Sequence, residues 1–183
     1  ASLLSYSDHP QHCHYDQLNM MLFSQGNAML TDLGYPEQTD PFNHKRFAFF
    51  NNTVAHNTVV VNAGKQERGP GQLHAFQPTG FAQLVDASCD NAYPEATTTY
   101  RRAHMLVELS PTQSYLFDAF YVRGGQQHDY VALGPPSDFT AEPPLGPVQK
   151  KGTLAGEDVP LQHFYDDPKY ADSPLGTIRY TGY

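Results

Sequence analysis

The sequence has no tryptophan, only two cysteines among its 183 residues, and no long hydrophobic run. Cys13 and Cys89 are too few for a disulfide framework and lack a Cys-x-x-Cys spacing, and the sequence leaves open whether they pair. No stretch approaches the roughly 18–20 apolar residues that cross a membrane, so we expect no membrane partner. The length fits one domain, residues 1–183, which is large enough to bury its own core.

Positive charge is also scarce. The chain has 11 lysines and arginines against 19 aspartates and glutamates, which gives a net charge of −8 with neutral histidines. A chain of this charge repels phosphate backbones, which argues against a nucleic-acid partner. An anionic substrate is not excluded, because pairing within a cleft can outweigh charges that are screened beyond about 8–10 Å.

Helical periodicity is missing, and strand patterns separated by turn residues dominate instead. The turns are expected at Ser24 to Asn27 and at Ser110 to Gln113. The expected strands are Leu18 to Phe23, Ala28 to Asp32, Thr58 to Val61, Phe81 to Asp86, Arg102 to Leu109, Tyr115 to Val122 and His128 to Leu133. This pattern predicts an all-β fold, an antiparallel β-sandwich of two packed sheets.

The last fifty residues differ from the rest. Gly134 to Pro147 holds five prolines, and the segment beyond it is rich in Gly, Asp and Tyr with few apolar runs. Proline cannot donate to a strand ladder, so we expect residues 134–183 to form either an irregular segment that wraps over the sheets or an irregular tail. The core of the domain is then expected at about residues 9–133.

Histidines are plentiful and unevenly placed. Of nine in the chain, His9, His12 and His14 fall within six residues, and side chains at alternate strand positions share a face. Asp32 ends the first predicted hairpin and His56 precedes a β-branched run; imidazole and carboxylate are ligands that Zn²⁺ favours. Spacing alone does not make a site, since a strict hairpin leaves His14 too far from Asp32 unless the chain bends back.

Other polar residues have simpler interpretations. We expect the charges of Lys45, Arg46, Arg101 and Arg102 to be solvated rather than bound to substrate. His104 and His128 lie in predicted strands and are expected to be core or edge residues. A separate hypothesis concerns His14-Tyr15-Asp16 followed by His56, which mimics the two-histidine, one-carboxylate iron site of metal oxygenases.

Three linked motifs resemble the heparinase II/III-like family of polysaccharide lyases. They are His12 to Leu18, Asp32 to Gly34, and Ala55 to Asn62. The family pattern is a histidine pair followed by Asp and Leu, an Asp-x-Gly after the hairpin, and a His-Asn-Thr-Val-Val strand. Tyr115 to Phe120 and Gly124-Gly125 are similar to its later strands, so the resemblance covers about residues 9–133. Cys13 stands where the family usually has glycine, and this bulkier side chain is expected to narrow the site.

The resemblance implies an architecture and a set of roles. In this family an N-terminal α/α toroid domain precedes an antiparallel β-sandwich, and the chain resembles only the sandwich. His12 corresponds to the catalytic histidine, and His14, Asp32 and His56 correspond to the ligands of a structural Zn²⁺. The toroid supplies the catalytic tyrosine and the Asn or Arg groups that neutralise the uronate carboxylate, so we expect this chain alone to be inactive.

The implied activity is β-elimination on uronic-acid polysaccharides such as alginate or heparin. The implied partners are an anionic uronate polysaccharide or oligosaccharide and a toroid domain, with a homodimer left open, and the implied location is periplasmic or secreted. Which polymer is cleaved is not specified by the motifs. The alternative hypothesis is a non-catalytic carbohydrate-binding β-sandwich whose metal is purely structural.

Overall fold

The structure, a computed structural model, describes residues 1–6, 14–34, 50–136, 138–151 and 157–158. Its strands and short 3-10 helices are β1 (Ser2–Leu4), β2 (Met20–Ser24), β3 (Asn27–Leu30), η2 (Thr53–Ala55), β4 (Val59–Val61), β5 (Gln72–Gln77), β6 (Ala82–Ser88), η3 (Asp90–Ala92), β7 (Thr97–Ser110), β8 (Gln113–Gly124) and β9 (His128–Tyr130). Among these residues, no helix has the length and hydropathy needed to span a membrane.

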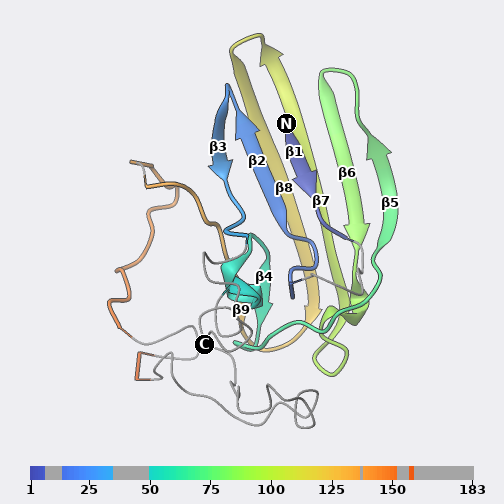
Figure 1. The fold of residues 1–183 in the computed structure, drawn as a ribbon, viewed down its shortest axis with the longest axis vertical. Helices are drawn as coiled ribbons and strands as arrows, with labels where there is room; N and C mark the ends of the chain where they lie inside the picture. Colours follow the sequence, from blue (N-terminus) through green and yellow to red (C-terminus); the bar gives the residue numbers. More distant parts are fainter. Residues whose placement is uncertain (7–13, 35–49, 137, 152–156, 159–183) are drawn as a thin grey trace.

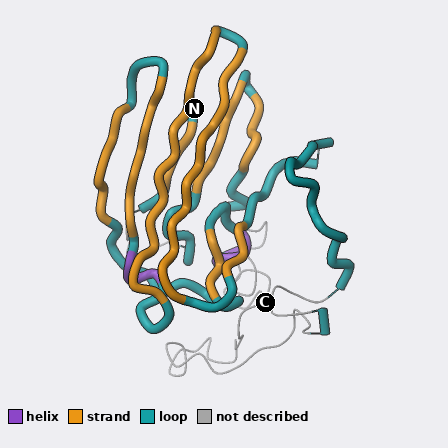
Figure 2. The backbone as a smooth tube through the Cα atoms, turned by 180° about the vertical axis from the view of Figure 1, so that it is seen from behind, coloured by secondary structure: helices purple, strands orange, loops and turns teal. Residues whose placement is uncertain are grey.

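The strands form three antiparallel sheets, with strand orders β1-β2-β3, β4-β9 and β5-β6-β7-β8. The four-stranded sheet is a long twisted layer. The three-stranded sheet lies over it, and β4 and β9 lie beside its lower end (Figure 1), an arrangement also visible from behind in Figure 2. The predicted all-β antiparallel sandwich is therefore confirmed.

Two long hairpins agree with the turn residues in the sequence. In the first, Gln25 and Gly26 both have positive φ, and β2 pairs with β3 around them. Such φ values are those of the tight turns that match the twist of paired strands. In the second hairpin, β7 begins at Thr97, five residues before the predicted start. Strands β1 and β5 were not predicted, because β1 has only three residues and β5 is largely polar and exposed.

The hydrophobic core lies between β4 and the inner face of the four-stranded sheet. Tyr100 of β7 is fully buried at its centre and packs edge-on against Phe120, with ring centroids 4.8 Å apart. Its other edge-on neighbour is Tyr93, at 5.5 Å. Val59 and Val61 of β4 and Leu18 belong to the same cluster. This core places the chain just before β4, which carries His56, directly against β7.

The proline-rich segment has no regular secondary structure where the structure describes it. Residues 134–136 and 138–151 are almost entirely exposed, including the side chains of Phe139 and Val148. In Figure 1 the described part of this segment runs away from the sheets rather than across them. Where it is described, the segment is irregular, as expected, and it extends from the sheets as a tail.

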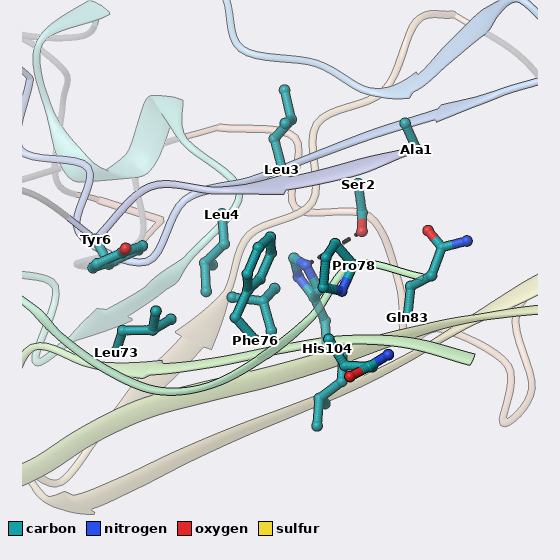
Figure 3. A pocket seen from close by; sticks show the side chains of 13 residues that line it. Ala1, Ser2, Leu3, Leu4, Tyr6, Leu73, Phe76, Pro78, Gln83 and His104 are labelled. Atoms are coloured by element: carbon teal, nitrogen blue, oxygen red, sulfur yellow. Dashed lines mark hydrogen bonds between the residues drawn. The ribbon is translucent and has the colours of Figure 1, made fainter. Parts of the chain in front are cut away.

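A cavity of about 380 Å³ opens between β1 and the four-stranded sheet (Figure 3). Apolar side chains such as Leu4, Leu73 and Phe76 line most of it. His104, on β7, lies at its floor with 1% of its surface exposed, and its Nε2 is 3.3 Å from Ser2 Oγ. Burial, reinforced by the positive charge of Arg102, lowers the pKa of His104 to about 4. His104 is therefore neutral in the folded protein at physiological pH.

This burial predicts a pH-dependent loss of stability. The unfolded chain protonates His104 near pH 6.5, whereas the folded chain does so only near pH 4, so acidification between these values favours unfolding. We expect His104→Leu to remove this contribution, which amounts to about 3 kcal/mol by pH 4. Urea unfolding of both proteins between pH 4 and 8 measures the difference; parallel pH profiles would show that His104 does not titrate abnormally.

Candidate metal centre

Three predicted ligands, His14, Asp32 and His56, come together from three separate segments. His14 precedes β2, Asp32 follows β3, and His56 lies between η2 and β4. One donor atom from each of them lies within 4.8 Å of the other two. His12, the predicted catalytic residue, lies outside the described residues, as does Cys13.

A bend before β2 brings His14 back toward Asp32. The Asn19 N–H donates to the Asp16 carbonyl at 2.9 Å, and Leu18 adopts a positive φ of 58°. The Leu18 N–H donates to the Ser5 carbonyl at 2.8 Å, which ties the bend to the end of β1. The sequence required such a bend because a straight hairpin would hold His14 and Asp32 apart.

His56 is positioned by the short helix η2. Its N–H donates to the Thr53 carbonyl at 3.1 Å, and the side chain of Asn52 caps the helix by accepting from the Thr53 N–H. The imidazole is fully buried, and its Nδ1 is 2.8 Å from Oδ2 of Asp32. The ring of His14 lies beside it, with centroids 5.1 Å apart.

The carboxylate of Asp32 is held at both oxygens. Asn19 Nδ2 donates to Oδ2 at 2.7 Å, and the Gly34 N–H donates to Oδ1 at 2.7 Å. Burial alone would raise the pKa of Asp32, but the hydrogen bond and charge of His56 and the Gly34 N–H bring it below its usual value. Asp32 is therefore ionised at neutral pH.

The surroundings of His14 and Asp32 favour the protonation states in which these side chains bind metal ions. Burial, and then the adjacent His56, lower the pKa of His14, so its imidazole is neutral at pH 7. Burial raises the pKa of Asp16, although the two histidines oppose this shift. A neutral imidazole and an ionised carboxylate are the forms in which these side chains bind metal ions.

The donor set fits a divalent transition metal. Zn²⁺ binds imidazole nitrogen and carboxylate oxygen at about 2.0–2.2 Å, which brings ligand atoms within a few ångströms of one another. Nε2 of His56 is buried, and within the described ranges it has no hydrogen-bond partner. The carboxylate in the cluster is Asp32 rather than Asp16, which was the residue required by the oxygenase hypothesis.

Two basic residues near the His14, Asp32 and His56 cluster, Lys65 and Arg68, were not identified by the sequence analysis. Lys65 Nζ lies 4.2 Å and Arg68 Cζ 4.5 Å from the ring centroid of Tyr15, the residue after His14. The charge of Arg68 also contributes to the lowered pKa of His14. Both follow β4 in the segment Lys65-Gln66-Glu67-Arg68, where a basic pair three residues apart was the available signal.

The expectation that Arg102 is solvated is wrong. Arg102 is fully buried on the inner face of β7, and it forms two hydrogen bonds with the carboxylate of Asp118. Arg101, the preceding residue, does point outward and pairs with Asp86. The alternation of β7 places Arg102 on the same side as Tyr100 and His104, and this period-2 pattern was the signal that could have revealed its burial.

Comparison with known proteins gives consistent matches. Residues 1–119 match the family described as Heparinase II/III-like, C-terminal. An alginate lyase of Stenotrophomonas maltophilia (strain K279a) is 29% identical over 107 residues, which covers 50% of this chain and 14% of that protein. The solved structure of a heparinase III, the BT4657 gene product, superposes with a TM-score of 0.61 at 18% identity. That superposition covers 75% of this chain and 21% of the other. The chain thus spans about a seventh to a fifth of the length of these relatives.

Metal binding at this cluster is testable with an isosteric change. We expect a divalent metal ion to raise the melting temperature of the wild-type protein, because an ion bound only by the folded state stabilises it. Asp32→Asn keeps the size of the side chain but removes the charge, so this metal-dependent increase should disappear. Differential scanning calorimetry with added Zn²⁺ and with EDTA measures it. An equal increase in the variant would show that the ion binds elsewhere.

Proposed function

The chain belongs to the heparinase II/III-like family, and on this premise we propose that it is the β-sandwich domain of a polysaccharide lyase that cleaves uronic-acid polymers by β-elimination. The observation that carries the proposal is the convergence of His14, Asp32 and His56, the three residues that the family pattern assigns to a metal. The relatives named as an alginate lyase and a heparinase III support an acidic polysaccharide as the substrate class.

The reaction requires a base near the C5 proton of a uronate. When the neighbouring carboxylate is neutralised, the base takes this proton and the electron pair of the C–H bond forms the C4–C5 double bond. The C4–O4 bond breaks, and the departing oxygen takes a proton from an acid. We assign the base to His12. The acid, a tyrosine, and the groups that neutralise the carboxylate belong to the toroid domain in this proposal.

The ion at the cluster is proposed to be Zn²⁺ with a structural role. His14, Asp32 and His56 would hold it, and a water molecule or a nearby side chain would complete four ligands. When bound, the ion supplies a fixed positive charge that links three chain segments. His12 lies two residues before His14, so the segment that carries the base is anchored close to a ligand. The domain's contribution is therefore to hold His12 in position.

A non-catalytic carbohydrate-binding sandwich is the second candidate. It shares with the first candidate the cluster of His14, Asp32 and His56, which would then hold a purely structural metal ion. In either case we propose that the ligand is a carbohydrate polymer and that the protein is periplasmic or secreted, as the family resemblance implies. The two candidates differ in whether His12 takes part in bond cleavage.

Replacing His12 in the complete enzyme separates these candidates. We expect His12→Ala to lower kcat by at least about 100-fold, the usual range for loss of a general base. Its zinc content and melting temperature should match those of the wild type. His9→Ala is the matched control, because it removes a nearby histidine, and its kcat should stay within twofold. Ultraviolet absorbance of the unsaturated uronate product gives the rates; unchanged turnover in His12→Ala would exclude His12 as the base.

The 183-residue chain by itself should show no lyase activity, because its proposed partners in catalysis lie in another domain. Mixing the chain with a separately produced toroid domain should restore part of the turnover if the two domains associate. The same absorbance assay, run on alginate and on heparin, tests both statements. Robust turnover by the purified chain alone would contradict the division of roles proposed here.

A further inference from the structure

Asn19 connects two of the three segments that carry the cluster. Its side-chain Nδ2 donates to Asp32 Oδ2 at 2.7 Å, and its Oδ1 accepts from the Asn57 N–H at 2.9 Å. Oδ2 of Asp32 is the same oxygen that lies 2.8 Å from His56 Nδ1. Asn19 is only 3% exposed. One buried amide therefore fixes the Asp32 carboxylate and the backbone next to His56 relative to each other.

Arg102 fixes the backbone on either side of this amide. Its Nη1 donates to the Leu18 carbonyl at 2.7 Å and to the Asn57 carbonyl at 2.5 Å. These carbonyls belong to the residue before Asn19 and the residue after His56. The other edge of the guanidinium is held by Asp118. Because both ends of Arg102 are bound, the two carbonyls lie at a separation set by a rigid, planar group.

The bend at Leu18 needs this support. A positive φ is unfavourable for leucine and persists only where surrounding contacts impose it. The hydrogen bond from Arg102 to the Leu18 carbonyl and the one from the Leu18 N–H to Ser5 are such contacts. They hold the turn that leads back to His14.

We propose that Asn19 is a positioning residue for the metal centre, and that Arg102 holds the backbone from which Asn19 acts. The proposal rests on the metal site described under the proposed function. A carboxylate that is free to rotate offers its lone pairs in many directions. With Asn19 on Oδ2 and the Gly34 N–H on Oδ1, the orientation of Asp32 is fixed before an ion arrives.

The effect of losing Asn19 follows from this arrangement. Removing a partner that orients a metal ligand typically weakens metal binding by about 10–100-fold. We expect that loss in Asn19→Leu, because leucine has the same branching and number of side-chain heavy atoms but can neither donate nor accept a hydrogen bond. Asn27→Leu is the matched control, because the Asn27 side chain is exposed and, among the described residues, hydrogen-bonds only to the Gln25 carbonyl in the hairpin turn. Its metal affinity should remain within twofold of the wild type.

The experiment measures the dissociation constants of Zn²⁺ and Co²⁺ by chelator competition on the folded complete protein. The visible spectrum of the Co²⁺ form and the melting temperature of the metal-free form are recorded as well. A weaker dissociation constant with an altered Co²⁺ spectrum in Asn19→Leu supports the proposal. A wild-type dissociation constant and spectrum, with only a lower melting temperature, would overturn it by showing that Asn19 merely stabilises the fold.

Two further variants keep the test decisive if Asn19→Leu does not fold. Asn19→Ser retains a smaller polar side chain that cannot bridge both partners, so the same weakening is expected. Arg102→Gln is compared with Arg101→Gln, its exposed neighbour on β7, and only the first should weaken metal binding. If the wild type binds neither ion, the metal site itself fails. If the wild type binds both and every variant matches it, only the positioning role fails.

Discussion

A single buried charge, the guanidinium of Arg102, joins the parts of this fold that lie around the cluster of His14, Asp32 and His56. It pairs with Asp118 on β8 and donates hydrogen bonds to the hydroxyl of Tyr130 on β9 and to the carbonyls of Leu18 and Asn57. A buried arginine without such partners would be strongly destabilising, and removing one partner of a buried pair typically costs 3–5 kcal/mol. The sheets and the two loops must therefore stay in one arrangement for this charge to remain satisfied.

The core beside Arg102 is polar as well as aromatic, and this makes its packing specific. The hydroxyl of Tyr100 donates to the Val59 carbonyl at 2.6 Å, and it lies 2.8 Å from both Thr58 Oγ1 and Gln66 Nε2. Burial raises the pKa of Tyr100, so the phenol keeps its proton. A buried network of this kind is satisfied in only one register, which fixes β4 against β7. Because β4 begins three residues after His56, the packing of β4 against the core also fixes the position of His56.

The sequence predicted the parts of the fold that local patterns encode. The first hairpin follows from turn residues such as Gly26, and β7 and β8 follow from alternating side chains. The three proposed metal ligands were identified from a family pattern. Their spacing in the sequence did not identify them, because His14 reaches Asp32 only if the chain bends back. That bend is made at Leu18, and leucine carries no turn signal. Alternation along β7 could have indicated that Arg102 is buried, but not which groups it binds, because its carbonyl partners lie 45 and 84 residues away. Contacts at such separations leave no local pattern.

The bend at Leu18 and Arg102, which holds it, are far apart in the sequence, and this separation affects the order of events during synthesis. Leu18 leaves the ribosome 84 residues before Arg102, which is roughly 4 to 17 seconds at the usual elongation rates of about 5–20 residues per second. During the last 46 residues of that interval, after His56 has been added, the chain contains His14, Asp32 and His56 but not yet the guanidinium that holds their backbone. A metal ion captured then would meet loosely held ligands. If the cluster binds a metal ion as proposed, tight binding would require β7 to be in place, so it would report that the second half of the sandwich has closed.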